Sequence, residues 1–189
     1  MPQDFKTKYL STRVILDCTE LHCEMPSSLL LNSELLSYYK NHTTVKALLG
    51  ISPKGFFTFI GQVYTGSISD REMVGRSGIL NLPFSEGDSV MADKALPLRI
   101  SSLLESLCIF RLFLGMSDQT SAEDVVATQE IASFRIHNER AINKVKNFKI
   151  FDAVIPLIQL GVLNQKWCVC VSCYTICKIL SSMFKTQTR

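Results

Sequence analysis

Residues 44–66, TVKALLGISPKGFFTFIGQVYTG, contain two apolar runs with the composition of β-strands. Ser52-Pro53-Lys54-Gly55 separates the runs, and proline and glycine at these places are typical of a tight turn. The segment therefore predicts an antiparallel hairpin. It is the clearest hairpin in the chain, and the other elements are placed around it.

Two more strands are predicted, one on each side of the hairpin. Residues 12–24 favour a single strand with the apolar run Val14-Ile15-Leu16, and residues 88–93, DSVMAD, favour a shorter one. Both apolar runs end on an aspartate. Because an unpaired buried carboxylate is costly, such an aspartate indicates either a surface turn or a site where its charge holds a cation.

Helices are predicted over residues 69–81 and 121–148. Ser69 is the expected N-cap of the first helix. A capping box at Ser121 and apolar residues at helical spacing define the second helix. Residues 26–40 and 96–116 are ambiguous. The order strand, hairpin, helix, strand, helix indicates a mixed α/β fold around a central sheet.

The composition is that of an ordinary globular protein. The 189 residues are 47% hydrophobic and 20% charged, and the net charge of +3 neither demands nor excludes a nucleic acid partner. The N-terminus, MPQDFKTKYLSTR, lacks the apolar core of a signal peptide. We therefore expect the seven cysteines to be reduced thiols.

Four of these cysteines lie close together, at Cys168, Cys170, Cys173 and Cys177. Their spacing lacks the two separated pairs of an ordinary structural zinc site, although zinc is kept as a minor alternative. The last three follow helical spacing, so an apolar helix face is the simpler interpretation. Only eleven residues separate Lys166 from Lys178, which we take as too short to cross a bilayer.

Four carboxylates fall at positions where they could converge. Asp17 and Asp93 follow the two apolar runs, Glu139 lies on or at the edge of the inward face of the predicted long helix, and Asp70 follows the hairpin. Each has an ordinary explanation: Asp70 suits a helix N-terminus, and Glu139 can pair with Arg135. Together they favour a site for Mg²⁺ or Mn²⁺, because these ions prefer oxygen ligands.

Several blocks of the sequence resemble the DDE endonuclease domain of PIF/Harbinger-type transposases. They are RVILDCTEL, PSSLLLNSELLSYYKNHTTVKALLGISPKG, FTFIGQVYTGSISDREM, GDSVMAD and RIHNERAINKVKNF. The resemblance covers residues 10–155 and implies an RNase H-like fold, a mixed central sheet flanked by helices. Residues 156–189 are left as a divergent, Cys-rich tail that we expect to be helical.

The resemblance also implies an activity and its residues. Asp17, Asp93 and Glu139 match the catalytic triad, and with Asp70 they are the expected metal positions. The family chemistry is hydrolysis of DNA with two Mg²⁺ or Mn²⁺ ions and no covalent intermediate, and the implied location is the nucleus. Expected contacts to DNA phosphates come from basic side chains of the last helix, namely Arg135, His137, Arg140, Lys144 and Lys146.

The chain departs from the family pattern in places. Lys94-Ala95-Leu96-Pro97 and residues 99–114 replace the usual sequence between the second and third triad positions, and Asn138 stands where an apolar residue is usual. No DNA-binding motif precedes residue 10, so a separate DNA-binding protein is an expected partner, and homo-oligomers are left open. The alternative function is a domesticated or decayed module that binds metal or DNA without cutting.

Overall fold

The computed structural model of the chain describes residues 11–85, 88–92, 108–111, 136 and 138–187. Its labelled elements are β1 (Thr12–His22), α2 (Leu29–Leu35), β2 (Leu36–Ser37), β3 (His42–Ile51), β4 (Phe57–Thr65), α3 (Asp70–Ser77), the 3-10 turn η1 (Ile79–Asn81), β5 (Ser89–Ala92), β6 (Cys108–Arg111), the 3-10 turn η3 (Leu157–Gln159) and α5 (Leu160–Gln187). Residues 138–146 are also helical.

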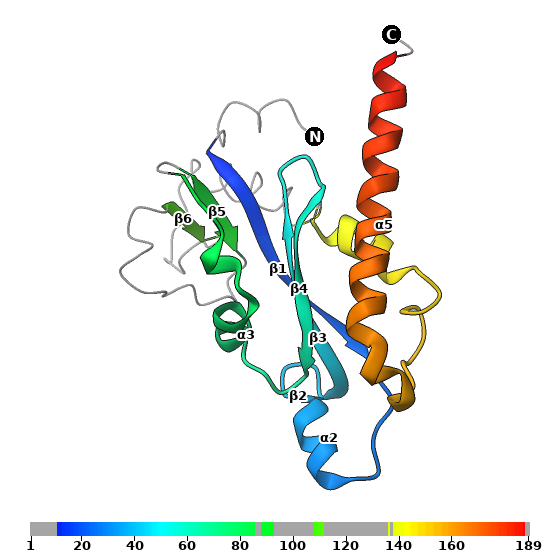
Figure 1. The fold of residues 1–189 in the computed structure, drawn as a ribbon. Helices are drawn as coiled ribbons and strands as arrows, with labels where there is room; N and C mark the ends of the chain where they lie inside the picture. Colours follow the sequence, from blue (N-terminus) through cyan, green and yellow to red (C-terminus); the bar gives the residue numbers. More distant parts are fainter. Residues whose placement is uncertain (1–10, 86–87, 93–107, 112–135, 137, 188–189) are drawn as a thin grey trace, which may run out of the picture.

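The strands form one mixed sheet (Figure 1). Its order is β2-β3-β1-β5-β6, with β4 paired to β3 on the edge away from β1. Strand β3 is antiparallel to β1 and to β4, whereas β5 runs parallel to β1 and β6 runs parallel to β5. Helices flank this sheet, which confirms the expected mixed α/β, RNase H-like fold.

The predicted hairpin is β3 and β4, and its turn is the expected one. The N–H of Gly55 donates to the carbonyl of Ser52, and the N–H of Phe56 donates to the Ser52 hydroxyl. Gly55 has a φ of 80°, which glycine adopts without the steric cost of a side chain. The turn chemistry read from the sequence therefore sets the position of the hairpin.

The helix predicted over residues 69–81 is confirmed, but its last turn is wound more tightly than an α-helix. Ser69 accepts a hydrogen bond from the backbone N–H of Glu72, as expected for an N-cap. Gly78, at a φ of 78°, ends α3, and the last predicted turn is the 3-10 turn η1.

The two segments whose structure the sequence left ambiguous contain both helix and strand. Within residues 26–40, α2 is followed by the two-residue strand β2, and within residues 96–116 the strand β6 lies parallel to β5. Of the long helix predicted over 121–148, residues 136 and 138–146 are helical. The remainder of its predicted N-terminal part lies outside the described residues.

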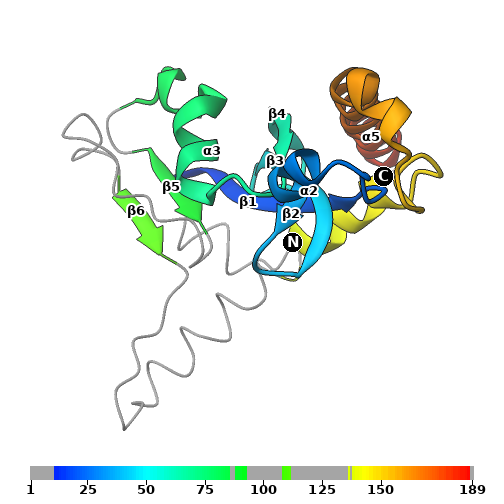
Figure 2. The ribbon, with the colours of Figure 1, turned by 90° about the horizontal axis from the view of Figure 1, so that it is seen from below.

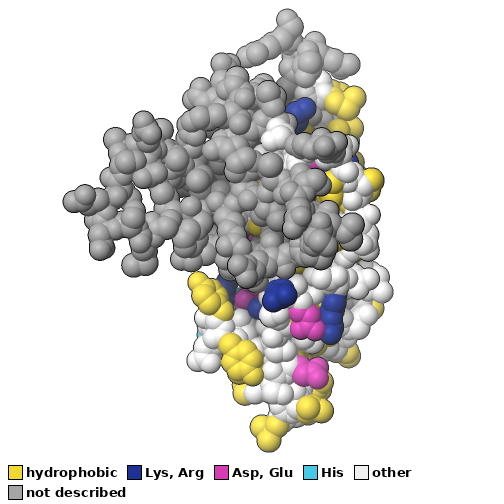
Figure 3. Space-filling view, turned by 90° about the vertical axis from the view of Figure 1, so that its left-hand side faces the viewer, with side chains coloured by type: hydrophobic (Ala, Val, Ile, Leu, Met, Phe, Trp, Pro, Cys, Tyr) yellow, Lys and Arg dark blue, Asp and Glu magenta, His cyan; other side chains and the backbone are white. Residues whose placement is uncertain are grey.

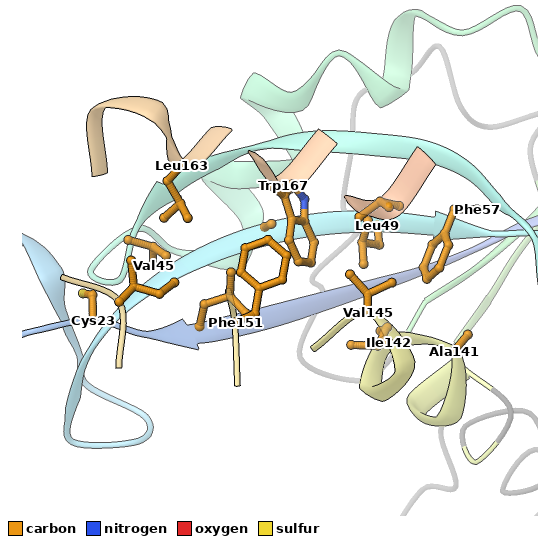
Figure 4. Close-up of a cluster of buried hydrophobic side chains, with 14 of the residues drawn as sticks. Cys23, Val45, Leu49, Phe57, Ala141, Ile142, Val145, Phe151, Leu163 and Trp167 are labelled. Atoms are coloured by element: carbon orange, nitrogen blue, oxygen red, sulfur yellow. The ribbon is translucent and has the colours of Figure 1, made fainter. Parts of the chain in front are cut away.

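Two hydrophobic clusters cover the two faces of the sheet. Val14, Leu16 and Leu48 pack against α3, which lies on the β5 side of the sheet (Figure 2). The second cluster lies under residues 138–146 and α5, where side chains from both helical segments meet those of β3 (Figure 4). Its labelled members in the figure are Cys23, Val45, Leu49, Phe57, Ala141, Ile142, Val145, Phe151, Leu163 and Trp167.

Helix α5 packs along β4 with one of its faces. Leu163, Trp167 and Val171 are fully buried, and the Trp167 ring meets the Phe151 ring edge to face at 5.4 Å. The Nζ of Lys178 donates to the carbonyl of Gly55 at 2.6 Å, so this lysine is turned toward the hairpin. Helix α5 therefore shares its core with the sheet.

Helix α5 corrects the expectation that the apolar segment of the tail is too short to cross a bilayer. Lys166 and Lys178 do not limit the apolar segment, because Leu157–Phe184 is long and apolar enough to cross a membrane by length and composition alone. Only 11% of its most apolar window is buried in the described structure. Much of the apolar surface of α5 is thus exposed in the described structure.

Candidate functional site

Asp17 lies inside β1, not at its end as the apolar run had suggested. The strand continues to His22 because residues 15–22 pair without a break with β3. The last described pair between β1 and β5 is Leu16 with Ala92, directly before Asp17. Asp17 is half-buried at this point of the sheet. Asp93 follows Ala92 in sequence but lies outside the described residues.

Glu139 lies on the helical residues 138–146, which cover the sheet face that contains Asp17. Asp17 pairs with Leu49 of β3, and paired residues share a face of a sheet. Leu49 belongs to the same cluster as Ala141 and Ile142. The structure therefore places Asp17 and the helix that bears Glu139 on one side of the sheet.

Glu139 lies at the edge of the inward face of its helix, next to the buried Asn138 and Ile142. Glu139 is exposed, whereas its neighbour Asn138 is only 3% exposed. The Oδ1 atom of Asn138 has no hydrogen-bond partner among the described residues, which is costly for a buried polar atom. The helix thus buries the amide of Asn138, and the carboxylate of Glu139 stands beside it at the surface.

Asp70 lies in a different polar network, centred on Lys46. The Nζ of Lys46 is 3.6 Å from Oδ1 of Asp70 and 3.9 Å from Oε1 of Glu20, and it donates to the carbonyl of Ile68. Glu20 also accepts hydrogen bonds from the hydroxyls of Ser37 and Thr44. The network therefore holds one ammonium between two carboxylates.

Burial decides the protonation behaviour of this network. Loss of solvent raises the pKa of Asp70 above its usual value, and the positive charge of Lys46 acts in the opposite direction. Burial also raises the pKa of the nearby Cys18 thiol strongly, and the negative charges of Asp70 and Asp17 act in the same direction. Cys18 is therefore a neutral, unreactive thiol at physiological pH.

The structure does not bring Asp70 to the same face as Asp17. Glu20 pairs with Lys46 across β1 and β3, and it lies three residues after Asp17. Because successive side chains of a strand alternate between faces, Asp17 points away from the Glu20–Lys46–Asp70 network. No group of three or more His, Cys, Asp or Glu side chains that could hold a metal exists among the described residues. The complete triad stays a prediction, because Asp93 lies outside them.

Neither Lys46 nor Glu20 is among the site residues predicted from the sequence. Glu20 had a visible signal, since it is the second acid of RVILDCTEL and belongs to a strand that pairs with the hairpin. Lys46 is a lysine within an apolar run, a position where a charged side chain needs a partner. Only the strand register shows that these two residues face each other.

Three of the predicted phosphate-binding residues are described. Arg140 and Lys144 are exposed, and Lys146 is partly buried. Burial and the charge of Lys40 lower the pKa of Lys146, whereas Glu20 and Asp17 act to raise it. Arg135 and His137 lie outside the described residues. On the face shown in Figure 3, basic side chains lie next to acidic ones instead of forming one continuous basic surface.

The cysteines of α5 are free thiols. Cys168 and Cys170 are partly buried, and Cys173 and Cys177 are exposed. They form no metal-binding group with other described side chains. This arrangement favours the helix-face interpretation over the zinc alternative.

A comparison with protein families decides the class of the chain. The model of the DDE superfamily endonucleases matches residues 16–178. The chain belongs to the DDE superfamily endonucleases. The match spans every predicted site residue of this DDE endonuclease and continues through the first two-thirds of α5. No curated protein and no solved structure matches the chain. Membership indicates a transposase-type nuclease with DNA as its substrate, in a family that generally uses divalent metal ions.

Proposed function

We propose that this chain is the endonuclease domain of a Harbinger-like transposase, which hydrolyses DNA through Asp17, Asp93 and Glu139. The position of Asp17 carries the proposal. It lies beside the last pair between β1 and β5, on the sheet face that residues 138–146 cover. A strand carboxylate and a helix carboxylate on one face are what a shared cation site requires.

The chemistry of these side chains fits Mg²⁺ or Mn²⁺, because carboxylate oxygens are the ligands that both ions prefer. A pair of such ions would supply activation of the attacking water and stabilisation of the leaving oxygen. The rigid sheet holds Asp17, and the packed helix holds Glu139. Arg140 and Lys144, exposed on the same helix, are placed to meet DNA phosphates.

Asp70 has a different place in this proposal. Its neighbour Lys46 neutralises part of its charge and holds it on the opposite face from Asp17. We therefore assign Asp70 as an accessory acid of the fold and keep the triad as the metal-binding set. Residues 10–155 then form the endonuclease unit, and residues 156–189 a Cys-rich extension that packs on it.

The resemblance carries three further parts of the proposal. The protein acts in the nucleus, where its DNA substrate is. A separate DNA-binding protein supplies recognition of the DNA sequence, because the basic side chains described here offer only phosphate contacts, which are independent of sequence. The third part is assembly of the domain into homo-oligomers.

The decisive experiment is nicking of supercoiled plasmid by the full chain in Mn²⁺. We expect nicking by the parent and a loss of about 100-fold or more in Asp17→Asn, Asp93→Asn and Glu139→Gln, since misplacement of one group by 1 Å already costs about that factor. Asp152→Asn is the matched control, because Asp152 is an exposed acid outside the site. Chelation of the metal should abolish nicking by the parent and the control.

A second measurement separates the nuclease from the alternative. A folded parent that binds duplex DNA by fluorescence anisotropy, yet fails to nick it in Mn²⁺ or Mg²⁺, is the domesticated or decayed module. A ligand that binds only the folded state raises the melting temperature. Stabilisation by Mn²⁺ in the parent, and its loss in Asp17→Asn, would then show that the metal site persists without catalysis.

A further inference from the structure

Two tyrosines stand at the tip of the turn between β2 and β3. Tyr38 is 79% exposed and Tyr39 is 90% exposed, although a buried aromatic ring is among the side chains that stabilise a fold most. Neither side chain has a hydrogen bond, an ion pair or a ring contact with any described residue. The two rings therefore contribute little to the fold and present their faces to solvent.

The turn holds these rings in a fixed place. The N–H of Asn41 donates to the carbonyl of Ser37 at 2.8 Å, which closes the turn. Ser37 is fully buried and donates through its hydroxyl to Glu20 of β1. Asn41 has a φ of 55°, a left-handed conformation that asparagine tolerates better than most residues. A ligand that meets the rings thus finds a turn that is already ordered, which lowers the entropic cost of binding.

The turn lies within electrostatic reach of the candidate nuclease site. Burial lowers the pKa of Lys146, and the positive charge of Lys40, which follows the two tyrosines, acts in the same direction. The charge of Asp17 acts on the pKa of Lys146 in the opposite direction, so this lysine lies between the turn and a predicted catalytic acid. In Figure 2 the light-blue turn after β2 lies on the same side of the sheet as the yellow residues 138–146.

The aromatic rings fit a DNA strand whose bases are unpaired. In a duplex the faces of the bases are stacked on one another, and a protein reaches the phosphates and the base edges. A single strand leaves the base faces open, and aromatic side chains stack on them while basic side chains meet the phosphates. Two exposed tyrosines followed by an exposed lysine supply both kinds of contact.

The charges favour a DNA strand over a protein that covers the rings. Lys40 and Lys146 repel each other, because each is an ammonium group and the charge of one lowers the pKa of the other. A phosphate between the two lysines offsets this repulsion. An apolar protein surface on the tyrosines leaves the repulsion in place.

We propose that the β2–β3 turn binds unpaired bases of the DNA strand next to the cut, with Tyr38 and Tyr39 stacked on the bases and Lys40 and Lys146 at a phosphate. The inference deepens the proposed function and rests on it, since it names the form of DNA that the domain engages. Binding through the turn needs neither a metal ion nor the triad, so it can be measured separately from cleavage.

The test is the affinity of the full chain for a labelled oligothymidine strand and for a labelled duplex of equal length, by fluorescence anisotropy with EDTA present. We expect Tyr38→Ala with Tyr39→Ala to raise the dissociation constant for the single strand by at least about 10-fold, because the loss of one stacked base costs roughly 5- to 150-fold. The dissociation constant for the duplex should change by less than about 2-fold, since phosphate contacts dominate there.

Two matched variants show whether the rings themselves are responsible. Tyr38→Phe with Tyr39→Phe keeps both rings and should bind the single strand as the parent does. Leu29→Ala with Leu30→Ala removes two exposed apolar side chains from the neighbouring α2 and should leave binding unchanged. Circular dichroism and the melting temperature show that each variant is folded, and the single variant Tyr39→Ala replaces the double variant if the latter is not.

Salt separates stacking from charge. The tyrosine double variant should lose the same factor in affinity at every salt concentration. Lys40→Ala should instead reduce the slope of log affinity against log salt by about 0.7, the value of one phosphate contact on a single strand.

Three results would overturn the inference. They are single-strand binding by a folded tyrosine double variant that equals binding by the parent, an equal loss on the duplex, and an equal loss in the α2 control. Unchanged single-strand binding would assign the tyrosines to a protein partner. A parent that fails to nick plasmid, yet loses single-strand binding in the tyrosine double variant, would refute the proposed nuclease activity and support the site at the turn.

Discussion

The substitution Leu163→Ala tests whether α5 and the sheet unfold as one unit. Leu163 is 1% exposed and belongs to the cluster that joins α5 to β3. Alanine removes about three buried carbon groups at roughly 0.8 kcal/mol each, and the cavity left behind adds to the cost. We therefore expect a loss of about 3 kcal/mol in the free energy of unfolding, or a melting temperature lower by roughly 6–12 °C for a chain of this size.

The chain contains a convenient probe for this measurement. Trp167, its only tryptophan, is fully buried one turn after Leu163, so its fluorescence reports on the packing of α5. Circular dichroism reports on the whole fold. Urea titrations of the parent and of Leu163→Ala should give coincident transitions by both probes, with the midpoint lowered equally. Gln165→Ala, an exposed neighbour, should stay within about 0.5 kcal/mol of the parent.

One result would refute this reasoning. If Leu163→Ala shifts only the fluorescence transition and leaves the circular dichroism transition in place, then α5 detaches separately from the sheet. Residues 156–189 would in that case be an appended tail with its own stability.

Three further predictions concern polar side chains of the described structure. Lys46→Met should lower the free energy of unfolding by about 3 kcal/mol at pH 7.5, because it leaves the carboxylates of Glu20 and Asp70 without their cation. This loss of stability should become smaller at lower pH, as the two carboxylates protonate. Urea titrations at two pH values measure both effects. Asn138→Val should raise the free energy of unfolding by about 1 kcal/mol, since it removes a buried oxygen that has no hydrogen-bond partner among the described residues. A lower melting temperature would contradict this expectation. Hydrogen bonds from Arg13 and Ser85 lower the pKa of Asp88 below its usual value. Its contribution to stability is therefore complete above the usual pKa of an aspartate and is lost as the pH falls through the lower pKa of the folded state. Asp88→Asn should therefore be less stable than the parent at pH 7, and acid titration should show this difference disappear.

Local sequence determines much of this fold. The turn at Ser52-Pro53-Lys54-Gly55 and the N-cap at Ser69 lie where predicted, because their chemistry is contained within a few residues. The strand β6 could not be predicted in this way. A short strand in an apolar segment of ambiguous period is stabilised by its neighbour β5 and not by its own sequence.

The candidate site also has features that the sequence could predict and features that it could not. The acids Asp17 and Glu139 could be singled out from residue type and position, and the family model covers both. The sequence could not show which acids share a face of the sheet, because this depends on the alternation of side chains along β1 and on the register of β1 with β3. Asp70 illustrates the limit, since its partner Lys46 lies 24 residues earlier and meets it only through the pairing of β3 with its neighbours.

The sequence by itself determined the class of the protein, the hairpin and the capped helix, and it supplied the candidate acids, since these depend on residue types and short-range spacing. Tertiary structure alone decided that Glu20, Lys46 and Asp70 form one network and that Asp17 lies on the other face of the sheet. It also decided that α5 buries Trp167 while leaving Ile176 exposed. These outcomes depend on contacts between residues far apart in the chain, and a pattern along the sequence carries no information on which distant partner a side chain meets.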